Sequence, residues 1–330
     1  IIQFTRVPGG ESAQEMGRGK TGVRGQSNEV QMEGIVLKID RCSKHDGPGV
    51  RTVVFLKGCP LRCLWCSTPD SQRLEPPLLH METLCAQCGR CVSSCPEQAL
   101  QISGENVEID RERCKLCGRC LEVCLNNARR VSGTRMTLDE VYTIVDRSRG
   151  FWTRMPGGLT ISGGEMLCQF EFSKALLARC HEAGINTNIE TSCFAPMEKI
   201  RELLPYLDHV CCDVKHMDDA THKKLTGVSN RQILENIRMI SHEKDLILRY
   251  PVIPTCNDSD ENIEATADFI KTLGHRFNRV DLLPYHEYGT VTYQRLGLEY
   301  ALAGVPSISR EKMLAVKERM VARGVRAVVA

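Results

Sequence analysis

Three closely spaced cysteines are the part of this 330-residue chain with the clearest chemistry. Cys59, Cys63 and Cys66 lie in the segment GCPLRCLWC with the spacing CxxxCxxC. Thiolates are soft ligands that bind iron, and each iron of a cubane [4Fe-4S] cluster takes one protein ligand. Three cysteines without a fourth in the same segment therefore predict a cluster with one iron open to a substrate. The alternative is that these thiols are small buried side chains.

Two further cysteine runs follow, each with the spacing CxxCxxCxxxC, and together they form an internal repeat of about thirty residues. In two-cluster ferredoxins with this pattern, the fourth cysteine of each run binds the other run's cluster. Zinc is the alternative, because CxxC pairs also build zinc sites. The predicted ligand sets are Cys85, Cys88, Cys91 and Cys124 for one cluster, and Cys114, Cys117, Cys120 and Cys95 for the other.

Outside these runs, short apolar segments rich in β-branched residues alternate with helical periods. The alternation predicts parallel βαβ units, hence an α/β fold with a partial (β/α)6 barrel of the TIM type. Sites in such folds gather at the carboxyl ends of the strands. The predicted strands are residues 51–58, 159–164, 185–191, 209–215, 246–254 and 279–286, and predicted helices include 138–149, 172–184 and 236–243.

The same patterns divide the chain into four segments. Residues 1–33 are polar and Gly-rich without an apolar period, so we expect a loose tail and no signal peptide. Residues 34–78 begin the barrel, 79–130 form an inserted ferredoxin-like module with two clusters, and 131–330 complete the barrel.

Composition narrows the class of protein. The net charge is +2, which predicts no general attraction to nucleic acid or membrane. The 18 cysteines come without a secretion signal, so we expect a cytoplasmic protein under reducing conditions and not a disulfide scaffold. We also expect a monomer. The thiols outside the ligand patterns are predicted to be core residues, and they are Cys168, Cys180, Cys211, Cys212 and Cys256.

At this point the chain resembles a known family, the glycyl-radical-enzyme activating enzymes of the radical S-adenosylmethionine (SAM) superfamily, of which pyruvate formate-lyase activase is the simplest member. The resemblance covers about residues 34–300. It rests on the segments 45–66, 162–165 (SGGE), 213–218 (DVKHMD) and 282–289 (LLPYHEYG). It implies reductive cleavage of SAM and removal of a Cα hydrogen from a glycine of a separate, large glycyl radical enzyme. The insert points to the subgroup that activates decarboxylases, dehydratases, C–N or C–S lyases and fumarate-adding synthases.

The resemblance also implies cofactors and roles for single residues. The cofactors are three [4Fe-4S] clusters, SAM and a monovalent cation, with a flavodoxin- or ferredoxin-type electron donor as a second partner. Glu165 is expected to pair with the α-ammonium group of SAM, and Asp46 to lie near the partner's glycyl loop. The residues implied to bind SAM or the cation are Trp65, Cys66, Ser67, Gly163, Gly164, Glu165, Glu190, Asp213, Val214, Lys215, Arg249 and His286.

Several of these residues have a second interpretation. Arg249 interrupts an apolar strand and needs an anionic partner, which is either the SAM carboxylate or a carboxylate of the chain. Trp65 is either an adenine contact or a core aromatic, and His286 either a SAM contact or a structural histidine.

Two other classes of protein share part of this pattern. A small electron carrier needs only the insert, and it leaves the three-cysteine motif and SGGE unexplained. A radical SAM enzyme that acts on a small molecule or on another peptide shares Cys59, Cys63, Cys66 and SGGE. It is not expected to combine the segments DGPGVR (46–51), DVKHMD and LPYHEYG.

Overall fold

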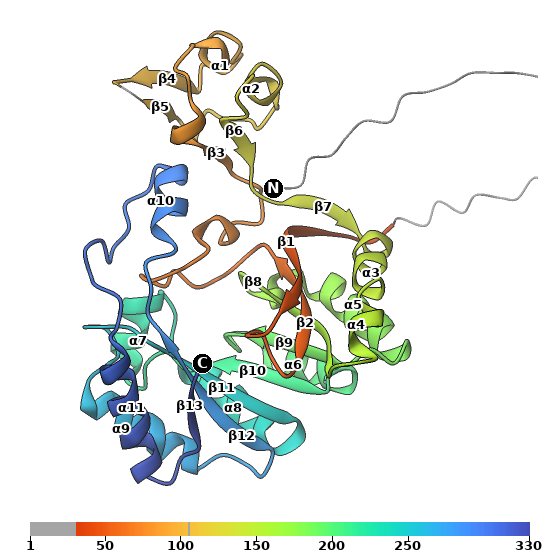
Figure 1. Ribbon diagram of the computed structural model, residues 1–330, viewed down its shortest axis with the longest axis vertical. Helices are drawn as coiled ribbons and strands as arrows, with labels where there is room; N and C mark the ends of the chain where they lie inside the picture. The colour runs from red at the N-terminus through yellow and green to blue at the C-terminus, as the bar shows by residue number, and fades with distance from the viewer. Residues whose placement is uncertain (1–30, 105) are drawn as a thin grey trace, which may run out of the picture. The chain divides into compact units, whose positions relative to one another are not determined.

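A computed structural model describes residues 31–104 and 106–330 (Figure 1). Most of the predicted tail, up to Val30, lies outside the described residues. Glu33, the last residue assigned to that tail, is already the first residue of strand β1 (Glu33–Ser43).

A nine-stranded sheet dominates the described part of the chain, in the order β13-β12-β11-β10-β9-β8-β2-β1-β7. Seven strands of this sheet run parallel: β2, β8, β9, β10, β11, β12 and β13. The other two, β1 and β7, join one edge in antiparallel fashion. The parallel strands follow one another in chain order, which is the winding of a barrel, and the sheet stays open between β13 and β7. The remaining strands are β2 (Val50–Leu56), β7 (Thr134–Thr137), β8 (Gly157–Gly163), β9 (Thr187–Thr191), β10 (His209–Asp213), β11 (Asp245–Val252), β12 (Phe277–Pro284) and β13 (Ala327–Val329).

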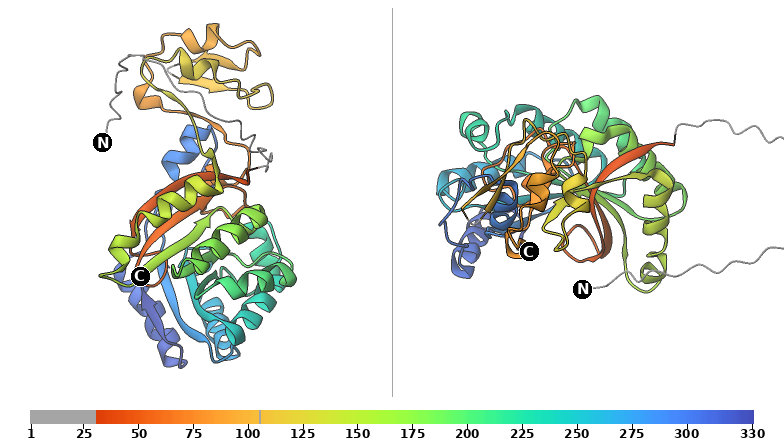
Figure 2. Two further views of the ribbon diagram at one scale, coloured as in Figure 1. Left: turned by 90° about the vertical axis from the view of Figure 1, so that its right-hand side faces the viewer. Right: turned by 90° about the horizontal axis from the view of Figure 1, so that it is seen from above.

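Helices follow the strands and pack against them (Figures 1 and 2). Apolar side chains of both layers form one core, for example Ile161 and Ile189 of the sheet with Leu177 and Ile237 of the helices. The helices are α3 (Leu138–Asp146), α4 (Arg149–Trp152), α5 (Phe170–Glu182), α6 (Met197–Leu203), α7 (Asp219–Thr226), α8 (Arg231–Glu243), α9 (Asp260–Lys271), α10 (Thr290–Leu296) and α11 (Arg310–Ala322).

The predicted α/β fold with a parallel sheet is confirmed, since all six predicted strands and the three predicted helices are present. The parallel strands are seven within the described residues, not six. The additional strand, β13, is only three residues long and leaves no pattern of its own. β7 (TRMT) is a polar edge strand, so it lacks the apolar alternation that marks a half-buried strand.

The two cysteine runs lie between β3 (Leu78–His80) and β6 (Arg129–Val131), which pair in antiparallel fashion. Each run contributes one short helix, and each helix is preceded by a glycine with positive φ, Gly89 at 70° and Gly118 at 81°. Equivalent residues of the two runs are 29 positions apart, so the sequence repeat is also a structural repeat. The elements between β3 and β6 are η2 (Glu82–Leu84), α1 (Arg90–Ser93), β4 (Leu100–Ser103), β5 (Asn106–Ile109) and α2 (Arg119–Glu122).

Among the thiols predicted to be core residues, Cys180, Cys211 and Cys212 are buried. Cys256 is only half-buried, and the prediction is wrong for Cys168, which is exposed. Cys168 belongs to the 3₁₀ helix η3 (Met166–Gln169), whose buried face is occupied by Met166 and Leu167.

Within the described residues, no helix combines the length and the apolar character that crossing a membrane requires. The expected cytoplasmic location and monomeric state stay predictions.

Candidate active site

A cavity of about 330 Å³ opens at the carboxyl ends of the parallel strands. Most of the residues predicted for the SAM site line it, from the ends of six parallel strands and from the loop between β1 and β2. Glu165 and Val214 are the two that do not line it. The predicted residues in its wall are Asp46, Cys59, Cys63, Trp65, Cys66, Ser67, Gly163, Gly164, Glu190, Asp213, Lys215, Arg249 and His286.

The cysteine loop that follows β2, residues 59–66, is held in place by the end of α7. The backbone N–H of Arg62 donates to the Thr226 carbonyl at 2.6 Å, and the N–H of Leu64 donates to the Leu225 carbonyl at 3.0 Å. These carbonyls belong to the last turn of α7, where a helix leaves acceptors unused. These two bonds tie the cysteine loop to the end of α7.

Burial raises the pKa of all three cavity thiols, that of Cys63 to about 11. Lys215 opposes this effect at Cys63 but does not overcome it. Thiolates at this place therefore need further positive charge, which bound iron provides. No fourth cysteine lines the cavity in the described part of the chain. This donor set fits a [4Fe-4S] cluster with one iron open.

Two ion pairs lie in the cavity wall. Lys215 Nζ lies 2.6 Å from Asp213 Oδ2, and Arg249 donates to Glu190 Oε1. Burial raises the pKa of Glu190 to about 7, against the attraction of Arg249. For Lys215, burial favours a lower pKa, but the charges of Asp213 and Cys63 outweigh it and raise the pKa. Both signs of charge are thus available to a zwitterionic amino acid group such as that of SAM.

These ion pairs bear on the predicted monovalent cation. Glu190 and Asp213, two of its expected ligands, each already contact a cationic side chain of the chain. Among the described residues, no His, Cys, Asp and Glu side chains are grouped so that they could hold a single metal ion. A cubane makes a different demand, since each cysteine binds a different iron. The monovalent cation stays a prediction.

Glu165 is 1% exposed and lies behind the cavity wall. Its carboxylate accepts hydrogen bonds from Thr191 Oγ1 at 2.8 Å, from the backbone N–H and the hydroxyl of Ser192, and from the backbone N–H of Leu167 at 3.3 Å. The group therefore joins the end of β8 to the end of β9. The expected contact with the SAM ammonium stays a prediction, because the carboxylate does not line the cavity.

Gly163 and Gly164 allow a close approach between backbones. A Cβ on Gly163 would lie 2.2 Å from the Leu56 carbonyl oxygen, and one on Gly164 would lie 2.4 Å from the Gly58 carbonyl oxygen. The two glycines thus pack the end of β8 against β2 and against the residue before Cys59.

The other predicted residues take different positions. Trp65 both lines the cavity and packs against a buried cluster that contains Tyr293. His286 is exposed at the rim and stacks on Tyr288 with ring centres 3.8 Å apart. Val214 is buried in the core, and its backbone N–H donates to the Arg249 carbonyl at 2.9 Å.

Two serines with a role in this site were not predicted. Ser162 Oγ donates to Glu190 Oε2 at 2.7 Å, and Ser192 holds Glu165 as described above. Ser162 is the first residue of the SGGE motif, and Ser192 lies two residues after Glu190. Their position at strand ends beside charged residues was the available signal.

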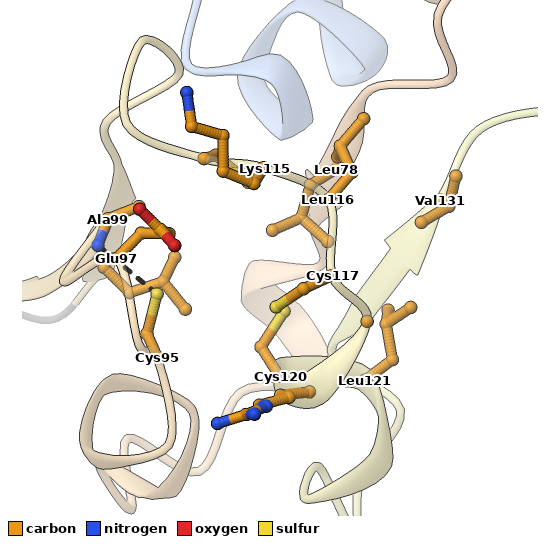
Figure 3. Close-up of a pocket in the computed structure, with 14 residues that line it drawn as sticks. Leu78, Cys95, Glu97, Ala99, Lys115, Leu116, Cys117, Cys120, Leu121 and Val131 are labelled. Atoms are coloured by element: carbon orange, nitrogen blue, oxygen red, sulfur yellow. Dashed lines mark hydrogen bonds between the residues drawn. The ribbon is translucent and has the colours of Figure 1, made fainter.

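A second cavity lies inside the insert and is lined by four cysteines from both runs: Cys95, Cys114, Cys117 and Cys120 (Figure 3). In Figure 3 the side chains of Cys117 and Cys120 point toward each other, and the dashed line marks the bond from the Ala99 backbone N–H to Cys95 Sγ at 3.3 Å. One cysteine of the first run thus shares a cavity with three of the second.

Comparisons with known proteins show the family to which the chain belongs. Residues 53–270 match the Radical SAM superfamily. The chain is 45% identical over 281 residues to the (2S)-3-sulfopropanediol sulfolyase activating enzyme of Bilophila wadsworthia, covering 83% of this chain and 92% of the relative. It is 41% identical over 279 residues to the (2S)-3-sulfopropanediol dehydratase activating enzyme of Klebsiella oxytoca (82% and 88%). It is 37% identical over 286 residues to the choline trimethylamine-lyase activating enzyme of Oleidesulfovibrio alaskensis (85% and 92%). The chain therefore belongs to the radical SAM superfamily and, within it, to the activating enzymes of glycyl radical enzymes.

Proposed function

We propose that this protein installs a radical on one glycine of a large partner enzyme, with Cys59, Cys63 and Cys66 as the ligands of its SAM cluster. The observation that carries the proposal is the single cavity in which these three thiols meet two ion pairs at the strand ends. The combination suits a cofactor with an amino acid group at one end and a reacting carbon at the other.

When bound, the reduced cluster supplies the electron that cleaves SAM, and SAM supplies the group that removes the glycine hydrogen. The chain's own residues bind SAM and orient it. Lys215 and Arg249 offer cationic partners to the SAM carboxylate, and Asp213 and Glu190 offer anionic partners to its ammonium group. Each of them is already directed by its ion pair, so little rearrangement is needed on binding.

Asp46 lies in the same cavity wall, in the loop between β1 and β2. Its backbone carbonyl accepts from Thr160 Oγ1 at 2.7 Å and from Asn188 Nδ2 at 3.2 Å. These bonds fix the loop, and we assign its carboxylate to the approach of the partner's glycyl segment.

We further propose that residues 79–130 hold two [4Fe-4S] clusters and relay electrons from a flavodoxin- or ferredoxin-type donor into the barrel. The cavity lined by Cys95, Cys114, Cys117 and Cys120 supports the exchanged ligand set. Backbone N–H groups already donate to three of the ligand sulfurs, Cys85, Cys95 and Cys124, at 3.4, 3.3 and 3.2 Å. Such bonds favour thiolates that carry the charge of a cluster.

The test combines the reconstituted protein, SAM, a low-potential reductant and the cognate glycyl radical enzyme under anaerobic conditions. We expect an organic radical on the partner whose electron paramagnetic resonance (EPR) doublet collapses when the glycine is deuterated at Cα. The splitting comes from the one α-hydrogen that remains. Exposure to air should then cut the partner chain at this glycine. A matched reaction with the Cys59→Ala, Cys63→Ala, Cys66→Ala variant should give no radical.

Formation of deoxyadenosine with turnover of a small molecule, and no radical on any glycyl enzyme, would contradict the proposal. That result would favour a radical SAM enzyme with a small-molecule substrate.

A further inference from the structure

The two halves of the insert repeat differ at one buried position. Strands β4 and β5 correspond to β6 and β3 at a distance of 29 residues, and each pair forms a short antiparallel ladder. In one ladder Leu100 faces Ile109, whereas in the other Arg129 faces His80. An apolar pair in one half is thus replaced in the other by a polar pair, a histidine and a cationic arginine.

Arg129 is only 3% exposed, as buried as its counterpart Leu100 at 5%. Its Nη2 lies 3.8 Å from Cys91 Sγ and 3.5 Å from the Val107 carbonyl oxygen. Its Nη1 has no hydrogen-bond partner among the described residues. A buried guanidinium without an anion is costly, so the site requires a further acceptor. Cluster sulfides and thiolates are acceptors of the required charge.

The guanidinium also acts beyond Cys91. Burial raises the pKa of Cys120, a ligand of the other predicted set, and the charge of Arg129 opposes that rise. Among the described residues, however, Arg129 makes its direct N–H···S contact to Cys91 alone. The influence of Arg129 is therefore strongest on the set of Cys85, Cys88, Cys91 and Cys124.

We propose that Arg129 raises the reduction potential of the cluster held by Cys85, Cys88, Cys91 and Cys124 above that of its twin. The inference rests on the proposed two-cluster insert. Reduction adds one electron and one negative charge to a cluster, and a buried cation that donates to a ligand sulfur stabilises that charge. Leu100, at the equivalent place near the twin, provides neither charge nor donor. An electron that enters the insert therefore rests on the Cys91 cluster first.

The experiment uses the full chain with Cys59→Ala, Cys63→Ala and Cys66→Ala, so that only the insert clusters contribute, in an EPR-monitored redox titration. The parent should show two separate one-electron steps. Arg129→Leu should lower the ratio of reduced to oxidised Cys91 cluster at fixed potential at least tenfold, which is about 59 mV for one electron. The two steps should then converge. Arg129→Lys keeps the positive charge but loses the planar guanidinium, so it should lower the potential of the Cys91 cluster by less than Arg129→Leu does.

The matched control is Arg130→Leu, which removes the same charge from the exposed neighbouring residue and should change neither step. The reverse substitution, Leu100→Arg, should raise the reduction potential of the cluster held by Cys95, Cys114, Cys117 and Cys120. This variant tests the inference if Arg129→Leu fails to bind iron. Unchanged potentials in both Arg129→Leu and Leu100→Arg, at full iron content, would overturn the inference. A parent that lacks the insert clusters altogether would instead overturn the proposed two-cluster function.

Discussion

At the scale of single residues, the charged groups of this site occur in pairs that the chain completes by itself. The anionic partner that Arg249 requires is Glu190, and Lys215 finds Asp213. Glu165 goes further, because four donors from three residues of the chain surround it. Its structural importance is therefore open to measurement independently of SAM.

We predict that Glu165→Gln lowers the free energy of unfolding by about 1–3 kcal/mol, the cost of buried donors that lose an acceptor. A glutamine amide would turn its own N–H group toward the Ser192 N–H. Urea unfolding measures the loss, and Glu171→Gln on the surface of α5 serves as the control. If stability is unchanged and only SAM affinity falls, the carboxylate contacts SAM as the sequence had implied.

Sequence patterns predicted which cysteines lie together: Cys59, Cys63 and Cys66 line one cavity, and Cys95 shares another with three cysteines of the second run. That these cysteines bind iron stays a prediction. They did not predict the hydrogen bonds that orient a side chain. Nothing in SGGE indicates that the carboxylate of Glu165 accepts hydrogen bonds from Thr191 and Ser192. Arg129 was missed for a related reason, since a basic pair after a cysteine run has the pattern of a solvated surface. Only its alignment with Leu100, 29 residues earlier, would have marked it as buried.

At the scale of elements, the cysteine loop depends on the end of α7. The strand ends place the charged groups, but the loop's own backbone donors are satisfied by the carbonyls of Leu225 and Thr226. α7 ends there because Gly227 adopts the left-handed conformation, with φ of 84°. A substitution at this glycine should therefore change how firmly the three-cysteine loop holds its cluster.

We predict that Gly227→Ala releases iron from the three-cysteine site faster than the parent does, because the left-handed conformation costs a residue with a Cβ about 1–2 kcal/mol. The measurement is the rate of iron transfer to a chelator under anaerobic conditions. Gly324→Ala is the matched control, since Gly324 has φ of 82° after α11 with nothing within 4 Å of an added Cβ. Equal rates in the two variants would show that the end of α7 does not hold the loop.

At the scale of the whole molecule, the eleven predicted ligand cysteines fall into three sets. Two of these sets each line a cavity of their own. One cavity gathers Cys59, Cys63 and Cys66, and the other gathers Cys95 with three cysteines of the second run. The barrel brings the charged strand ends into the same cavity as the first set. The repeat explains why the second set crosses between runs.

We predict that the anaerobically reconstituted chain holds about twelve irons, four for each of three cubanes. Replacing Cys59, Cys63 and Cys66 by alanine should remove about four irons and abolish SAM cleavage, because only this set leaves an iron open to SAM. Cys168→Ala is the control, since this exposed thiol belongs to no set, and it should remove none. Metal analysis that found about four irons with two zinc ions would assign the insert to zinc instead. Cleavage of SAM by the triple variant would show that the open cluster lies elsewhere.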